Sequence, residues 1–100
     1  MPDRLIELLE NVMDEQTFLE FVRALLADRI DEVEKERLSP SHPYGSGANG
    51  WENGTIEMFL QAAISWADGS HFGRSRVDGK FTDNNWSMFA HFLYAGKIYE

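Results

Sequence analysis

The fold is decided by two stretches that each begin with a tryptophan. They are WENGTIEMFLQAAISW at residues 51–66 and WSMFAHFLYAGKI at residues 86–98. In both, apolar residues recur at intervals of three and four, which is the spacing of one face of an amphipathic helix. Such a face must be covered by a partner. The two stretches therefore predict two helices that pack within one helical domain.

The N-terminal third of the chain predicts two further helices. Residues 5–12 are mostly apolar, and residues 18–33 repeat apolar positions at helical spacing. Asp14 lies between them, where a short acidic side chain can cap the second helix. Residues 31–37 are almost all charged, which predicts a solvated end for that helix.

Two connections interrupt the helical pattern. Residues 39–50, SPSHPYGSGANG, combine prolines and glycines that exclude a helix, and this loop is long for a small domain. Residues 76–81, RVDGKF, carry the Asp-Gly turn of a small hairpin. We therefore predict a single all-α domain over residues 1–100, with about four helices, a long Gly/Ser/Pro loop, and a small hairpin before the last helix.

The helical stripes also predict which side chains form the core. Trp66 and Trp86 lie on the stripes and are expected to be buried with them. The other predicted core residues are Phe18, Val22, Leu25, Phe59, Leu60, Ile64, Phe89 and Leu93.

Composition narrows the classes of function. The formal net charge is −8, which opposes binding to nucleic acid or to anionic membranes because both need clustered Lys and Arg. Cysteine is absent, which excludes disulfides, thiolate zinc sites and cysteine nucleophiles. We find no signal-peptide pattern and no membrane-spanning stretch, and therefore expect a cytoplasmic protein.

The sequence contains no convincing motif for cofactor binding, metal binding or nucleophilic catalysis. Gly45 to Gly50, GSGANG, matches the letters of a dinucleotide-binding loop, but no strand precedes it, so a flexible loop is predicted. His42, His71 and His91 lack a second ligand at helical spacing, so no metal site is predicted. No serine lies in a nucleophile motif. We accordingly predict no catalytic residues, no cofactor and no enzymatic activity.

Three hypotheses for function remain. The leading one is an acidic protein-binding module, for example an immunity or antitoxin-like protein that neutralises a basic toxin, because the chain is small and strongly acidic. A second is a small ligand-binding or enzymatic domain with a pocket between the last two helices. A third is a structural subunit that dimerises through exposed Trp51, Tyr44 or Tyr99.

For the leading hypothesis, the expected partner site is the loop 41–54 with the acidic end of the second helix. Tyr44 and Trp51 are residue types enriched at interface hot spots. Glu32, Glu34 and Glu36 would steer a basic partner toward them. The alternative is that Trp51 folds back as a staple on the third helix and that the loop has no role.

Four short motifs resemble a family of small bacterial proteins known only as a domain of unknown function. They are FLEFV at 18–22, WENGT with FL at 51–60, WSMFA at 86–90, and AGKIYE at 95–100. The resemblance leaves out residues 34–50 and 69–84, and the long loop departs from the family's usual shorter link. It implies a small helical cytoplasmic protein, brings no activity, and supports no site on the loop.

Overall fold

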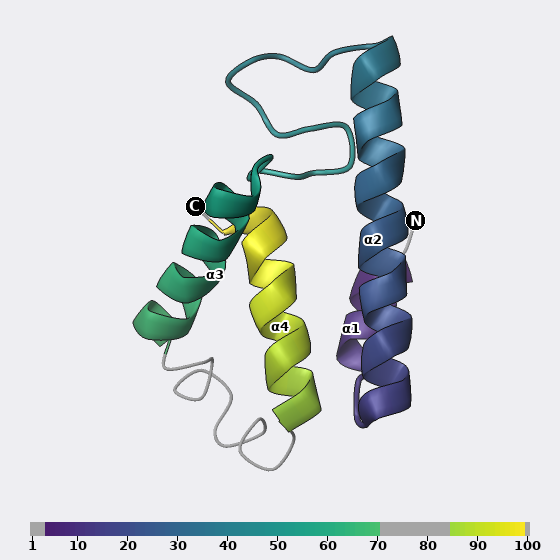
Figure 1. Ribbon diagram of the computed structural model, residues 1–100, viewed down its shortest axis with the longest axis vertical. Helices are drawn as coiled ribbons and strands as arrows, with labels where there is room; N and C mark the ends of the chain where they lie inside the picture. Colours follow the sequence, from purple (N-terminus) through teal and green to yellow (C-terminus); the bar gives the residue numbers. More distant parts are fainter. Residues whose placement is uncertain (1–3, 71–84, 100) are drawn as a thin grey trace.

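The computed structural model describes residues 4–70 and 85–99, and the regular secondary structure of these residues is all helical. The helices are α1 (Arg4–Glu10), α2 (Glu15–Leu38), α3 (Ile56–Ser70) and α4 (Asn85–Ile98). The predicted all-α class and the predicted set of four helices are confirmed (Figure 1). The hairpin predicted at 76–81 lies outside the described residues.

Local side-chain hydrogen bonds explain where two helices begin. Thr17 N–H donates to Asp14 Oδ1 over 2.9 Å, while Asp14 N–H donates to Thr17 Oγ1 over 3.1 Å. This reciprocal cap confirms the prediction for Asp14, and the backbone bond from Thr17 lowers the pKa of the Asp14 carboxyl. Thr55 caps α3 through a bond that its Oγ1 accepts from Met58 N–H.

Helix α4 is the centre of the assembly. It packs against α1, α2 and α3, and α1 also packs against α2. No Cα atom of α2 lies within 8 Å of one in α3, and Figure 1 shows α4 running between these two helices. The buried core joins α1, α2, α4 and the loop before α3, and Phe59 of α3 packs against it. It consists of Leu5, Leu9, Val12, Phe21, Leu25, Trp51 and Ala90.

The predicted core is right in part and wrong at four positions. Leu25 is buried, and Phe18, Val22, Phe59 and Leu93 pack against the core. The structure instead exposes Leu60 at 48%, Ile64 at 53%, Phe89 at 46% and Trp86 at 36%.

For Leu60 and Ile64 the reason is the rotation of α3. Its buried residues are Ala62 and Ala63, which bring α3 close to α4, and Ile56, Leu60 and Ile64 lie on the open side. Trp66 is half-buried. Trp86, also predicted to be core, is 36% exposed and lies against Phe18, with ring centroids 5.3 Å apart.

Gly96 allows the close approach of α3 and α4 and yields a stability prediction. A Cβ at position 96 would lie 2.7–2.9 Å from three atoms of the Phe59 ring. We expect Gly96→Ala to lower the free energy of unfolding by ~1–3 kcal/mol, because an overpacked core must shift. Urea unfolding monitored by circular dichroism measures the change.

The matched control is Gly69→Ala in α3. A Cβ there meets only Tyr99 Oη, at an ordinary 3.7 Å. This change should stabilise the protein by ~0.5–1 kcal/mol, because alanine favours the helix over glycine. Equal effects of the two substitutions would contradict a packing role for Gly96.

The length and apolar character of the helices determine whether one could cross a bilayer. None of the helices in residues 4–70 and 85–99 combines the length and the apolar character that a membrane crossing requires.

Candidate functional site

The C-terminal half of α2 holds the long loop in place. The predicted solvated end of this helix is exposed at most of residues 31–37, but Glu32 is buried and Glu36 is half-buried, and both carboxylates bind the loop. Glu32 is only 3% exposed. Its Oε1 accepts hydrogen bonds from Asn49 N–H at 2.9 Å and Trp51 N–H at 3.2 Å, and its Oε2 pairs with Arg29 Nη1 at 3.0 Å.

The glycines of GSGANG form the cradle for this carboxylate. A Cβ at Gly47 would collide with the carboxylate of Glu32, and Gly50 has a φ of 85°, which favours glycine. The N–H groups of Asn49 and Trp51 converge on the carboxylate, as backbone N–H groups converge on phosphate in other anion-binding loops. The loop therefore has the physical character of an anion-binding loop, and its anion is Glu32 of the same chain.

Glu36 and Asp31 add further attachment points. Glu36 accepts from the N–H and hydroxyl of Ser41 and from Ala48 N–H, and these bonds, led by the Ser41 hydroxyl, lower its pKa. Lys35, joined to Asp31 at 2.8 Å, lowers the pKa of that carboxyl, and Asn49 bonds to both side chains. The loop is thus bound to α2 at Ser41 and again at residues 48–51.

Glu36→Gln should make the free energy of unfolding depend less steeply on pH at acidic pH. The pKa of Glu36 is lowered from 4.5, so its stabilising contribution is present above that value and is lost as the pH falls through the folded pKa. The Glu36→Gln variant lacks this carboxylate, so it has no such contribution to lose at low pH. The difference in free energy of unfolding between the two proteins should therefore shrink between about pH 6 and about pH 3. Urea titrations at several pH values measure it, and parallel curves would contradict the prediction.

Trp51 is a buried staple between the loop and three helices. It is 7% exposed, its Nε1 donates to Asp28 Oδ2 at 2.8 Å, and its ring stacks on Phe59 with centroids 6.2 Å apart. Lys97 Nζ reaches the same Asp28 oxygen at 2.8 Å. Of the two alternatives for Trp51, the structure supports the staple, because the indole is not available as a surface anchor.

The five predicted partner-site residues do not form one surface. Tyr44 is 94% exposed, and its ring lies 5.7 Å from that of His42, centroid to centroid. Glu34 is exposed and pairs with Arg37 at 2.6 Å. Glu32 and Trp51 lie inside the fold and Glu36 is half-buried, so these three side chains serve the structure of the loop.

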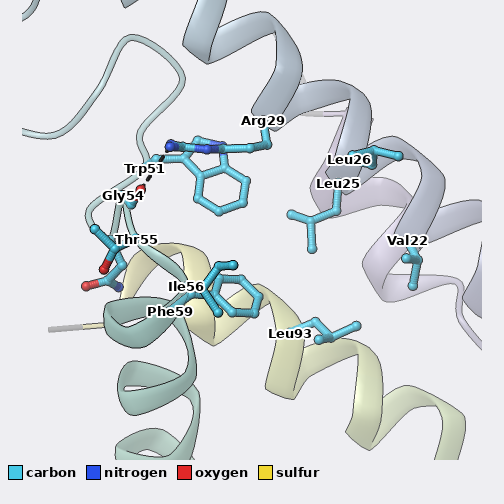
Figure 2. Close-up of a pocket in the computed structure, with 11 residues that line it drawn as sticks. Val22, Leu25, Leu26, Arg29, Trp51, Gly54, Thr55, Ile56, Phe59 and Leu93 are labelled. Carbon is cyan, nitrogen blue, oxygen red and sulfur yellow. Dashed lines mark hydrogen bonds between the residues drawn. The ribbon is translucent and has the colours of Figure 1, made fainter.

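A feature that the sequence analysis missed is an open apolar groove between α2 and α3. Its volume is about 430 Å³. Figure 2 shows Val22 and Leu26 of α2 on one side, Ile56 and Phe59 of α3 on the other, and Leu93 of α4 between them. One end is closed by Trp51 and by Arg29. The Arg29 guanidinium lies 5.2 Å from the Trp51 ring and donates to Gly54 C=O at 3.0 Å.

Exposed apolar side chains extend from both walls of this groove. On α2 the exposed fractions are 60% for Leu26, 61% for Ile30 and 52% for Val33. On α3, Ile56 is 75% exposed and is followed at four-residue steps by exposed Leu60 and Ile64. Both stripes were visible in the sequence, but periodicity alone does not tell a covered stripe from an open one.

Chemistry-bearing residues are sparse near the groove. The part of the chain that the structure describes contains no group of three or more His, Asp or Glu side chains placed to hold a metal ion. His91 Nδ1 lies 2.8 Å from the Ser87 carbonyl oxygen of the same helix. A second, more polar hollow of about 290 Å³ lies between α3 and Tyr99.

Comparison with known proteins places the chain in a family. Residues 14–100 match the sequence profile of a family of unknown function designated DUF7660. The chain belongs to this family. The match begins at the residue that caps α2 and spans the long loop, α3 and α4, whereas α1 lies outside it. Neither the curated proteins nor the solved structures include a match to this sequence.

Proposed function

We propose that the protein is a protein-binding module and that the groove between α2 and α3 is its docking surface. The observation that carries this proposal is the open apolar groove with exposed Leu26 and Ile56 on opposite walls. Large contiguous apolar surfaces are uncommon on monomers and typically mark sites of interaction. The lining offers few polar groups to orient a reaction, which favours docking over catalysis.

We further propose that the partner is a basic protein, as an immunity or antitoxin-like role would require. The net charge of −8 supports this, since opposite charges steer two proteins together. Exposed carboxylates on α1 and the first half of α2, including Glu7, Glu10, Glu15 and Glu20, supply part of that field. In this arrangement the apolar groove provides most of the affinity, and the carboxylates raise the rate of association.

The experiment compares aspartate substitutions at two exposed apolar residues. Ile56→Asp places a charge in the groove, whereas Leu38→Asp places the same charge at a 68% exposed residue that does not line it. Affinity capture with wild-type protein should recover one dominant basic protein, which Leu38→Asp retains and Ile56→Asp loses. Its association should slow between low and physiological salt. Capture that is equal for both variants would overturn the groove as the docking surface.

A further inference from the structure

Helix α4 contributes to the groove between α2 and α3 and extends its apolar surface. Leu93 lines the groove, between the two walls shown in Figure 2. Phe89 and Trp86 precede Leu93 at steps of four and three residues, so the three side chains share one face of α4. Phe89 and Trp86 are both exposed, and their ring centroids lie 6.3 Å apart. The open apolar surface therefore continues along α4 for about two turns.

The wall formed by α3 carries an apolar stripe of similar length. Ile56, Leu60 and Ile64 follow one another at four-residue steps, and all three are exposed. Helices α2 and α3 both pack on α4 and do not pack on each other. The three helices thus present apolar side chains to one shared position, which has the place of a further helix in a bundle.

The chemistry of the lining favours a helix over an extended segment in this position. Polar side chains line the groove only at Arg29, Asn53 and Thr55, near Trp51. The rest of the lining offers few hydrogen-bonding groups, so an extended peptide buried there would leave backbone N–H and C=O groups without partners. A helix satisfies these groups internally and can meet all three walls with one apolar stripe. The occupant that matches the lining is therefore an amphipathic helix.

The outer edge of the α3 stripe is acidic. Glu57 and Asp68 are exposed, and they lie eleven residues apart, so both project from the same side of α3 after about three turns. Ile64 lies between them on that side, four residues before Asp68, which places both carboxylates beside the apolar stripe. Helix α3, with the sequence IEMFLQAAISWADGS, contains no Lys or Arg to offset them. This edge of the groove is therefore negatively charged.

The opposite edge, on α2, carries a base instead. Arg23 is exposed and lies four residues after Leu19 and three before Leu26, so it borders the apolar residues of α2. Arg29, at the closed end of the groove, already pairs with Glu32 of its own chain. The two edges therefore differ in sign. An occupant that matches both edges carries its bases on the flank that faces α3.

We propose that the part of the partner that enters the groove is an amphipathic α-helix with Lys or Arg along one flank. The inference rests on the proposed function, which it narrows from a basic protein to one that presents a basic amphipathic helix. The apolar stripe of that helix packs on the three walls, and its bases meet Glu57 and Asp68 at the matching spacing of about three turns. A neutral or acidic residue on the other flank meets Arg23.

Synthetic helices test this assignment. The purified protein is titrated in a calorimeter with three peptides of about 18 residues that share one leucine stripe. The first carries lysines along one flank at the spacing of Glu57 and Asp68, the second carries glutamates there, and the third is the lysine peptide with a central proline. The lysine peptide should bind at least about fivefold more tightly than the glutamate peptide, and at least about tenfold more tightly than the proline peptide. Absence of binding, or absence of either preference, would overturn the inference.

Charge reversal on α3 locates the contact. Glu57→Lys combined with Asp68→Lys should invert the order of the lysine and glutamate peptides, because like charges then meet. The matched control is Glu7→Lys with Glu10→Lys. It makes the same change in net charge on α1, which contributes no side chain to the described groove lining, and it should leave the order unchanged. Circular dichroism checks that both variants keep their helices. Inversion in both double variants would show that net charge alone decides the preference and would overturn the contact with α3.

The peptide titrations and the capture of a basic protein can fail separately. If capture depends on Ile56 while the peptides show no preference for lysine or for a helix, the groove still docks a protein and only the helical occupant is excluded. If capture does not depend on Ile56, the proposed function itself is wrong, and this inference falls with it.

Discussion

Replacing Trp51 by alanine should lower the free energy of unfolding by ~3–5 kcal/mol, which is the usual cost of removing a large buried aromatic side chain. The indole is 7% exposed, stacks on Phe59 and donates a hydrogen bond to Asp28. Its removal opens a cavity where the loop, α2, α3 and α4 meet. Urea denaturation followed by circular dichroism measures the loss.

Tyr44→Ala is the matched control, because it removes an aromatic side chain from the same loop. Tyr44 is 94% exposed, so its replacement should change the free energy of unfolding by no more than ~0.5 kcal/mol. A loss below ~1 kcal/mol for Trp51→Ala would show that the indole does not staple the loop.

Replacing Glu32 by alanine should cost ~1–3 kcal/mol, because removing a buried carboxylate leaves its hydrogen-bond donors without an acceptor. Arg29 would lose its carboxylate, and the N–H groups of Asn49 and Trp51 would lose their acceptor inside the loop. The melting temperature should fall, and the amide protons of the two loop residues should exchange faster with solvent.

Glu34→Ala provides the comparison for Glu32→Ala, since Glu34 lies two residues further along the same helix. It is exposed and pairs only with exposed Arg37, so a change within ~0.5 kcal/mol is expected. Similar losses for the two variants would mean that the cost comes from helix propensity or net charge. They would exclude the specific role of the carboxylate in the loop.

The helices could be predicted because their signals are local. Residues 51–66 and 86–98 repeat apolar positions at helical spacing, and Asp14 caps the helix that follows it. The choice between two apolar faces of one helix is not local. Leu60 and Ile64 share α3 with the buried residue Ala63, and only the close approach of α4 decides which face is covered.

The candidate site could be predicted only in fragments. The sequence left Trp51 as either a surface anchor or a staple on the third helix, and it placed Glu32, Glu34 and Glu36 on a surface. Their interactions join segments that lie far apart in the chain, such as Glu32 with Asn49 and Asp28 with Lys97. The groove depends on two helices that do not touch, and no pattern within either helix reports that separation.

The attachment of the loop to α4 has a consequence for the order of folding during synthesis. Glu52 N–H donates to the Lys97 carbonyl, and Asn53 bonds to the carbonyls of Gly96 and Tyr99. Helices α1 and α2 can pair early because their contacts are local. The bonds of the loop to α2 can also form early, whereas those of Glu52 and Asn53 can form only after residues 96–99 have been synthesised. Until then the junction between the loop and α3 lacks its attachment to α4 and remains accessible to chaperones and proteases.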